Sequence, residues 1–534
     1  MMRRTIVVGL TVLLAQGCMS AKTSPVQPAL YSIPMYTKAD FEPPHLIPGV
    51  QDVDAPMNTE AYDRIVDNPF LAVNQNPLST FSIDVDTASY SNVRRFLNMG
   101  DLPPKDAVRI EELINYFSYN YTEPDGDEPF AVQAEVTVCP WEPSHYLTRI
   151  GIKGRELSAD ARPACNLVFL LDVSGSMVDE NKLPLVKQAL ARLVENLDAH
   201  DRIAIVVYAG ASGLVLPSTP VSEKEKILKS LNDLEAGGST NGGAGIQLAY
   251  ATAEANLIPG GNNRVILATD GDFNVGVTSE GALTSLIEQK RATGIYLTVL
   301  GFGMWNYKDA TLEALADLGN GNYAYIDSLR EAEKVFVHQL PSTLFTIAKD
   351  VKIQVEFNPA QIAGYRLIGY ENRLLRAEEF NDDKIDAGEI GAGHTVTALY
   401  ELVPVGAPVP AGTVDPLIYQ QTPALSSVSA TNELMTVKLR YKPLDSDESK
   451  LIAFAVPVRA TPIEQASPDL QFAGAVAQFG MLLRESPYKG RSDYDAAFTL
   501  AKSGIGEDPE GFRQEFLTLV KQAKGMKRDQ TASR

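Results

Sequence analysis

The stretch Asn166-Leu-Val-Phe-Leu-Leu-Asp172-Val-Ser174-Gly-Ser176-Met177 decides the fold of this 534-residue chain. Its first half is a continuous apolar run, which is typical of a strand buried on both faces of a parallel sheet. Its second half is a polar turn with one carboxylate and two hydroxyls. Because ligands bind beyond the carboxyl ends of the strands in open α/β sheets, the turn is a candidate binding site.

Around this stretch, apolar strands alternate with amphipathic helices from residue 164 to residue 345. The alternation predicts an α/β domain with a doubly wound, mainly parallel sheet and helices on both faces. Further strands are expected at 202–208, 264–269, 295–302 and 323–326, and helices are expected to begin near 183, 227, 246, 283, 312 and 332.

Both flanks of this α/β domain show the strict alternation of half-buried strands. Residues 130–138 and 146–152 alternate before it, and similar runs follow it near 351–357, 396–402 and 435–441. We expect the two flanks to pair, so that the α/β domain is inserted into a β-sandwich-like domain. The predicted folded parts are an N-terminal domain of helices and strands (81–160), the α/β domain (164–345), a β-sandwich-like domain (346–460) and a small C-terminal helical domain (465–530).

The first 17 residues are typical of a bacterial secretory signal, because Arg3 and Arg4 precede a short apolar stretch that ends in small residues before Cys18. These residues resemble a lipobox, which implies lipidation of Cys18; plain secretion with an incidental cysteine is the alternative. Met19, rather than Asp, follows the cysteine, which resembles an outer-membrane lipoprotein. We expect an exported protein, lipid-anchored in the cell envelope at the outer membrane and facing the periplasm or the surface. The proline-rich residues 18–80 predict an extended tether.

The charge and the cysteines limit the partners and the covalent framework. The net charge is −20 and the pI is about 4.8, and phosphate binding needs clustered Lys and Arg, so we expect no nucleic-acid partner. No stretch after the signal is expected to span a bilayer, so the lipid is the expected membrane contact. Cys139 and Cys165 could form a disulfide in an oxidising compartment, or both could be small buried residues.

Two further segments are expected at the same sheet edge as the turn at 172–176. A glycine-rich segment, residues 237–243, carries Thr240 before a predicted helix, and Asp270 follows the predicted strand at 264–269. Hard oxygen ligands of this kind suit Mg²⁺, with Mn²⁺ next and Ca²⁺ as a further candidate. The candidate metal ligands are Asp172, Ser174, Ser176, Thr240 and Asp270, with Asp272 as a doubtful addition.

This pattern, Asp-x-Ser-x-Ser followed by Thr and then Asp, resembles the metal-ion-dependent adhesion site (MIDAS) of von Willebrand factor type A (vWA) domains. The resemblance implies that the two serines and the threonine coordinate the metal directly or through water. It also implies that the aspartates act mainly through water or behind the direct ligands. The metal then takes a Glu or Asp side chain of a partner protein at its open position.

The resemblance extends beyond residues 164–345. Asn68-Pro-Phe70 and the stretches 81–90 and 110–117 are similar to the N-terminal region of bacterial YfbK-like vWA proteins. The stretches 479–484, 493–494 and 508–513 are similar to the C-terminal domain of that family. The resemblance therefore covers nearly everything after residue 65 and implies the architecture more than the function.

Two enzymatic interpretations of the sequence have less support than a binding function. Asp84-Val-Asp86-Thr87 is similar to the nucleophile motif of haloacid-dehalogenase phosphatases, but a downstream Lys with paired aspartates is missing, and Asp86 or Thr87 is expected to cap a helix instead. A serine hydrolase would need a positioned His, and none lies in the motif loops.

We therefore predict a non-enzymatic binding module that uses Mg²⁺ to capture an acidic side chain of a protein partner, with loops 209–216 and 272–280 selecting that partner. The alternatives are a structural assembly platform whose metal only ties loops together, and a metal-dependent hydrolase.

Overall fold

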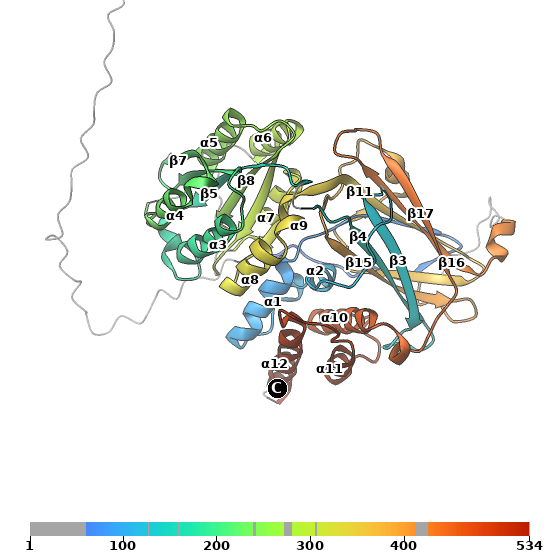
Figure 1. The fold of residues 1–534 in the computed structure, drawn as a ribbon. Helices are drawn as coiled ribbons and strands as arrows, with labels where there is room; N and C mark the ends of the chain where they lie inside the picture. Colours follow the sequence, from blue (N-terminus) through green and yellow to red (C-terminus); the bar gives the residue numbers. More distant parts are fainter. Residues whose placement is uncertain are drawn as a thin grey trace, which may run out of the picture. The chain divides into compact units, whose positions relative to one another are not determined.

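The computed structural model describes residues 60–126, 128–158, 161–238, 242–271, 280–304, 307–412 and 425–532. Residues 56–534 form one compact unit (Figure 1). The predicted signal, Cys18 and most of the predicted tether lie outside the described residues. Among the helices in the described part, none is long and apolar enough to cross a bilayer.

The α/β domain contains a six-stranded sheet in the order β10-β9-β8-β5-β6-β7 (Figure 1). All neighbouring strands are parallel except β7, which pairs antiparallel with β6 at the edge. The doubly wound, mainly parallel sheet is thereby confirmed. The strands are β5 (Cys165–Asp172), β6 (Arg202–Tyr208), β7 (Ser212–Pro220), β8 (Asn262–Thr269), β9 (Ile295–Gly301) and β10 (Tyr323–Tyr325).

Helices cover both faces of this sheet, as alternate side chains of β5 show. Leu167 and Phe169 pack in one core with α3, α4, α8 and α9, whereas Val168 and Leu170 pack in the other with α5, α6 and α7. This alternation explains the continuous apolar run in the sequence, because both faces of the strand are buried. The helices are α3 (Leu183–Glu195), α4 (Lys224–Asn232), α5 (Gly242–Ala255), α6 (Glu280–Ala292), α7 (Asp309–Leu318), α8 (Leu329–Glu333) and α9 (Leu340–Leu344).

The flanks of the α/β domain form a two-sheet β-sandwich, as predicted. One sheet has the order β1-β12-β15-β4-β3 and the other β13-β2-β11-β16-β17, with β14 beside β11. The expected pairing across the insertion is confirmed, because β4 runs antiparallel to β15, with Ile152 opposite Val396. The inner faces of both sheets share one apolar core. The strands are β1 (Leu71–Ala72), β2 (Leu78–Ser82), β3 (Phe130–Val138), β4 (Tyr146–Gly154), β11 (Thr346–Phe357), β12 (Ile362–Ile368), β13 (Leu374–Leu375), β14 (Ile390–Gly391), β15 (Thr395–Pro404), β16 (Glu433–Lys442) and β17 (Lys450–Pro457).

The extended tether predicted for residues 18–80 is wrong near its end. β1 pairs with β12 and β2 pairs with β11, so residues 71–82 belong to the sandwich. Their partners lie at least 270 positions away along the chain, with Ser82 opposite Lys352. Short strands of this kind leave little periodicity to detect.

The N-terminal segment 81–160 forms no core of its own. Its helices α1 (Ala88–Met99) and α2 (Ile110–Asn115) share one apolar core with the C-terminal helices, and its strands join the sandwich. Figure 1 shows the same grouping of α1 and α2 with the C-terminal helices. The helices of the predicted N-terminal domain and the predicted C-terminal domain therefore form one helical layer. The C-terminal helices are α10 (Pro468–Arg484), α11 (Tyr494–Ser503) and α12 (Phe512–Ala532).

Of the two alternatives for Cys139 and Cys165, a disulfide or two small buried residues, the structure has the second. Both cysteines are buried free thiols. Cys139 packs in the helical core and Cys165 packs in the α/β core, so the two side chains belong to separate parts of the fold. Burial raises the pKa of the Cys165 thiol to about 11, which keeps it protonated and unreactive at neutral pH.

Candidate metal centre

Two aspartates of the predicted site lie at one edge of the α/β sheet. Asp172 ends β5, and Asp270 follows the neighbouring parallel strand β8. Both side chains are fully buried, and the Thr269 hydroxyl donates a long hydrogen bond of 3.4 Å to Asp172 Oδ2. The parallel pairing of the two strands therefore brings together carboxylates that are 98 positions apart in the sequence.

The turn after β5 presents the two serine hydroxyls next to Asp172. The Ser174 backbone N–H donates to Asp172 Oδ1 at 2.9 Å, which fixes the carboxylate against the turn. The hydroxyl oxygens of Ser174 and Ser176 lie 3.0 Å apart. Ser174 is buried, whereas Ser176 is exposed. One side of the serine pair is thus held by the protein and the other faces outward.

The glycine-rich segment before Thr240 is hydrogen-bonded to the same turn. Gly237 N–H donates to the Val173 carbonyl at 2.7 Å, and Gly175 N–H donates to the Gly238 carbonyl at 3.0 Å. Gly238 has a φ of 87°, in the left-handed region that favours glycine. Thr240 and Asp272 lie outside the described residues, so the structure brings together Asp172, Ser174, Ser176 and Asp270 of the predicted set. We call these four residues the edge site.

Burial dominates the electrostatics of the edge site. It raises the pKa of the Asp172 carboxyl, and the Asp270 carboxylate adds to the rise, whereas the hydrogen bonds from Ser174 oppose it. A nearby cation would relieve this cost, because opposite charge favours the ionised form of a carboxyl group.

Sequence reasoning missed a lysine at the edge site. Lys182 Nζ lies 2.9 Å from Asp270 Oδ2, and both side chains are buried. The stem of Lys182 runs over Gly303, where a Cβ atom would stand 2.5 Å from Lys182 Cε. Gly303 has a φ of 77°, so two constraints favour glycine there. The sequence pattern around Lys182 does not indicate that it contacts the site. The position of its side chain depends on a glycine more than a hundred positions later in the chain.

The residues of the edge site fit a small divalent metal. Two ligands at right angles around an ion with bonds of about 2.1 Å are about 3.0 Å apart, which matches the separation of the Ser174 and Ser176 hydroxyl oxygens. The oxygen atoms of the site belong to hydroxyls and carboxylates, the donors that hard cations prefer. Ser174 and Ser176 would hold the ion directly, with Asp172 and Asp270 behind them.

The segments predicted to select the partner need a correction. Residues 212–220 form the edge strand β7 rather than a loop, so only the turn at 209–211 remains of the first segment. Residues 272–279 of the second lie outside the described residues. Val178, two positions after Ser176, exposes 67% of its apolar side chain.

The phosphatase-like motif lies in the interior and does not cap its helix by a side chain. Thr87 precedes α1 without a side-chain hydrogen bond to the helix. Asp86 Oδ1 instead accepts a hydrogen bond of 2.8 Å from the Tyr323 backbone N–H, and Asp84 Oδ1 accepts one of 3.0 Å from Asp86 N–H. The expected capping role is therefore wrong, and the motif joins the N-terminal segment to the α/β domain.

Three family models match successive parts of the chain. The model "von Willebrand factor" matches residues 56–149, and "von Willebrand factor type A domain" matches residues 166–338. The model "Uncharacterized protein YfbK, C-terminal" matches residues 342–526. The matches follow the order of the predicted resemblance, and the vWA match spans the inserted α/β domain.

A relative from Escherichia coli gives the same assignment. The chain is 45% identical to the uncharacterized protein YfbK of Escherichia coli over 475 residues, which cover 88% of this chain and 82% of that one. A solved von Willebrand factor type A structure from Catenulispora acidiphila is 16% identical and covers 73% of this chain and 89% of that one, with a TM-score of 0.40. Proximal thread matrix protein 1 of the mussel byssus, whose structure has a zinc-occupied MIDAS motif, is 21% identical over 34% of this chain and 48% of that one, with a TM-score of 0.29. The predicted resemblance is confirmed by the first of these.

Proposed function

Because the chain belongs to the YfbK-like family of von Willebrand factor type A proteins, we propose that its edge site binds Mg²⁺ and uses it to capture an acidic side chain of a protein partner. The observation that carries this proposal is the pair of serine hydroxyls 3.0 Å apart, one buried and one exposed, in front of two buried carboxylates. The exposed side leaves a coordination position for an outside ligand.

The charge of the donors favours a partner carboxylate. Ser174 and Ser176 are neutral, and Asp270 is already paired with Lys182 at 2.9 Å. A divalent ion held by such a set keeps much of its positive charge, so an anionic oxygen from outside completes it well. The separation of the hydroxyls is compatible with the short bonds of Mg²⁺.

The surroundings of the edge site favour binding a protein over catalysis. The exposed side chain of Val178, two positions after Ser176, offers apolar contact beside the metal position. Apolar contact around one strong polar anchor is the arrangement of a protein-binding surface. We therefore propose that the partner presents an Asp or Glu flanked by apolar residues, and that the protein is not an enzyme.

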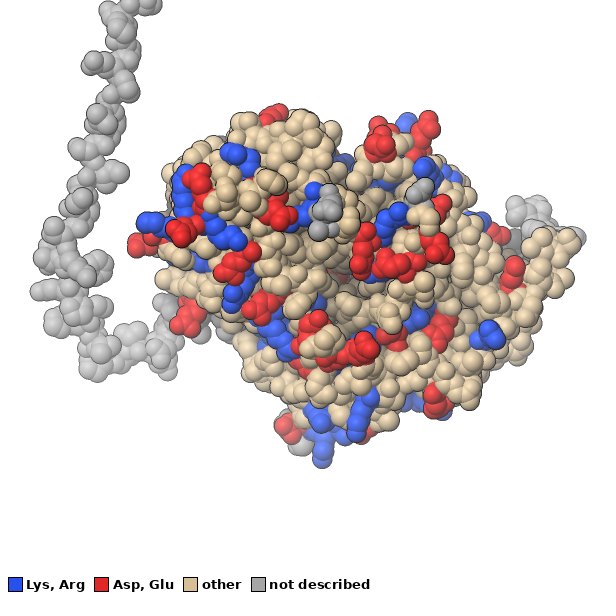
Figure 2. All heavy atoms as spheres, in the orientation of Figure 1, with Lys and Arg blue, Asp and Glu red and all other residues tan. Residues whose placement is uncertain are grey.

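The negative charge of the protein gives the metal a second role, which is to attract an acidic partner. We retain export and lipidation at Cys18 as proposals, which place the module in the bacterial cell envelope. The chain carries a net charge of −20, and on the face drawn in Figure 2 acidic side chains are interspersed with basic ones. An acidic partner is repelled by the net charge at long range, so the metal supplies the local attraction.

A pull-down with the tagged full chain from solubilised cell envelope tests the proposal. Capture in Mg²⁺ should be lost with EDTA and with Ser174→Ala. It should be kept with Ser230→Ala, which removes a hydroxyl on helix α4 that donates to the Lys226 carbonyl. Capture that survives both EDTA and Ser174→Ala contradicts it. If Mg²⁺ raises the melting temperature but leaves capture unchanged, the metal is structural and the assembly-platform alternative holds.

A further inference from the structure

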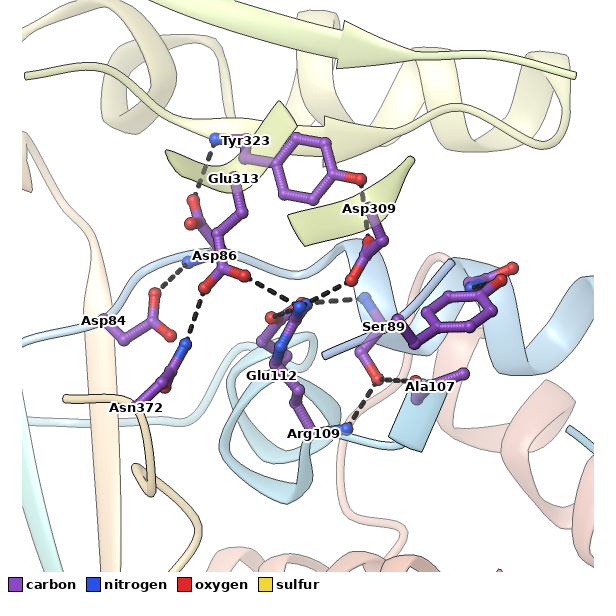
Figure 3. A network of polar contacts seen from close by, with 12 residues as sticks. Asp84, Asp86, Ser89, Ala107, Arg109, Glu112, Asp309, Glu313, Tyr323 and Asn372 are labelled. Atoms are coloured by element: carbon purple, nitrogen blue, oxygen red, sulfur yellow. Dashed lines mark hydrogen bonds and ion pairs between the residues drawn. The ribbon is translucent and has the colours of Figure 1, made fainter. Parts of the chain in front are cut away.

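A second group of acidic side chains lies where three segments of the fold meet. Asp84 comes from the segment between β2 and α1, Glu112 from α2, and Glu313 from α7 of the vWA domain. Figure 3 shows the three carboxylates pointing toward one another. All three residues are buried, with exposures of 4%, 0% and 6%. The proposed edge site uses none of them.

Two arginines are in contact with these carboxylates and with three further ones. Arg109 contacts Glu112, Asp309 and Glu313 at 2.5–2.9 Å. Arg373 contacts Glu313 at 3.0 Å and Asp317 at 2.5 Å, and lies 3.4 Å from both Asp84 and Asp86. We call this group the junction cluster: Asp84, Asp86, Glu112, Asp309, Glu313 and Asp317 with Arg109 and Arg373.

The junction cluster holds more negative than positive charge. Its six carboxylates face two guanidinium groups, which is a formal excess of four negative charges when all are ionised. Buried charge without compensation is costly, so the fold must supply protons or a cation. A divalent cation would cancel half of the excess.

Three carboxylate oxygens of the junction cluster lie close enough together to contact one cation. One carboxylate oxygen from each of Asp84, Glu112 and Glu313 lies within 4.8 Å of the others. Two oxygens on opposite sides of a Ca²⁺ ion are about 5 Å apart, because Ca–O bonds are about 2.3–2.6 Å. Three oxygens from different segments of the chain suit the flexible geometry of Ca²⁺ better than the near-ideal octahedral geometry that Mg²⁺ requires.

Unused oxygen atoms and a cavity supply an independent sign of a ligand. In the described part of the chain, no hydrogen bond reaches the buried atoms Asp84 Oδ2 and Glu389 Oε1, and Arg373 Nε, 3.4 Å from Asp84 Oδ2, is itself without one. Both carboxylates line a cavity of about 180 Å³. That volume has room for several waters. The rest of its charged lining is Asp86, Asp317, Asp386 and Arg373.

We infer that Asp84, Glu112 and Glu313 bind a Ca²⁺ ion, whose remaining ligands are waters held in the adjoining cavity. Ca²⁺ accepts six to eight oxygen ligands in flexible geometry, which three carboxylates and several waters can supply. The ion joins α7 of the vWA domain to the N-terminal segment and to α2. It therefore stabilises the contact between the vWA domain and the N-terminal segment. It takes no part in the partner capture proposed for the edge site.

Calcium titration of the metal-stripped full chain tests this inference, with Ser174→Ala and Ser176→Ala present so that the edge site does not contribute. Calorimetry should give one Ca²⁺ per chain, and excess Ca²⁺ should raise the melting temperature by about 3 °C. Ca²⁺ should also bind at least tenfold more tightly than Mg²⁺. A stripped chain that takes up no Ca²⁺, or that prefers Mg²⁺, overturns the inference.

Two isosteric variants in this background locate the ion. Asp84→Asn removes one ligand charge but keeps an oxygen to accept the Asp86 N–H, and it should weaken Ca²⁺ binding at least tenfold. Asp309→Asn is the control, since Asp309 is equally buried and touches Arg109 but is not one of the three ligands. Its Ca²⁺ affinity should stay within threefold. Equal losses in both variants would contradict the assignment, and if Asp84→Asn does not fold, the stoichiometry and the Ca²⁺ preference of the parent chain decide.

Discussion

The edge site and the junction cluster are both built from buried carboxylates, yet they are arranged for opposite purposes. At the edge site, neutral hydroxyls stand in front of the carboxylates and the Ser176 hydroxyl faces outward. In the junction cluster, Arg109 and Arg373 bind the carboxylates directly and nearly every group is buried. Hydroxyl donors leave positive charge on a metal for an outside partner, whereas the two guanidinium groups of the junction cluster neutralise part of the negative charge inside the protein. The edge site is therefore suited to recognising a partner, and the junction cluster to holding the domains together.

Removing an arginine from the junction cluster should give the largest effect on stability. Arg109→Ala leaves three buried carboxylates without their closest cation, so the free energy of unfolding should fall by about 3–5 kcal/mol. Urea unfolding of the purified chain measures it. The control is Arg192→Ala, which breaks a half-exposed pair with Glu195 and should cost less than about 0.5 kcal/mol. Similar costs for the two variants would contradict the structural role of the cluster.

Adding a methyl group at Gly303, behind the edge site, should have the next largest effect on stability. Gly303→Ala puts a Cβ atom against Lys182 and forces a φ of 77° on alanine, so unfolding should become easier by about 2 kcal/mol. Gly281→Ala, in helix α6 with open space around the new methyl, should instead stabilise by about 0.5 kcal/mol. Thermal unfolding of both variants checks the pair, and a neutral Gly303→Ala would mean that Lys182 is not held as described.

A histidine outside both regions limits the pH at which they can be compared. Burial, with Lys334 and Lys153 nearby, lowers the pKa of His394 to about 4, whereas the unfolded imidazole titrates near about 6.5. The unfolded chain therefore binds more protons between these values, so stability is full above about pH 6.5 and is lost as the pH falls toward 4. His394→Gln should reduce the loss between pH 7 and pH 5 by about 1 kcal/mol.

The matched change for this pH experiment is His200→Gln, at an exposed position. It should leave the acid dependence of urea unfolding as in the original chain. An unchanged acid dependence in His394→Gln would show that another group dominates. Both regions are best compared above pH 6.5, where His394 contributes its full stability.

The smallest effect on stability should come from the exposed hydroxyl of the edge site. Ser176→Ala removes an outward-facing group, so the free energy of unfolding in the absence of metal should change by less than about 0.5 kcal/mol. Mg²⁺ affinity should nevertheless fall at least tenfold. A large loss of stability in the metal-free chain would place Ser176 in the fold rather than in the site.

The edge site could be predicted from sequence because its decisive part is contiguous. Asp172, Ser174 and Ser176 lie within five positions at the end of an apolar run, and the rule for parallel sheets supplies Asp270. Strand β7 was not predicted, because Pro217 and Pro220 argue against a strand, although an edge strand tolerates proline.

The junction cluster could not be predicted, because its contacts join distant segments. Arg109 and Asp309 are 200 positions apart, and Asp86 accepts its hydrogen bond from Tyr323, 237 positions away. Periodicity reports only which face of an element is buried, and it does not identify the partner of a buried charge. The acidic motif at 84–87 was visible as a pattern, but its role depends on α2 and α7.

Titration of Mg²⁺ into the metal-stripped full chain is the most direct test of the central claim that the edge site is a metal centre. Calorimetry above pH 6.5 should show a Mg²⁺ site that is lost when Ser174 and Ser176 are both changed to alanine, while Ser230→Ala keeps it. The melting temperature of the stripped double variant should match that of the stripped original chain. Unchanged Mg²⁺ binding in the double variant would contradict the account.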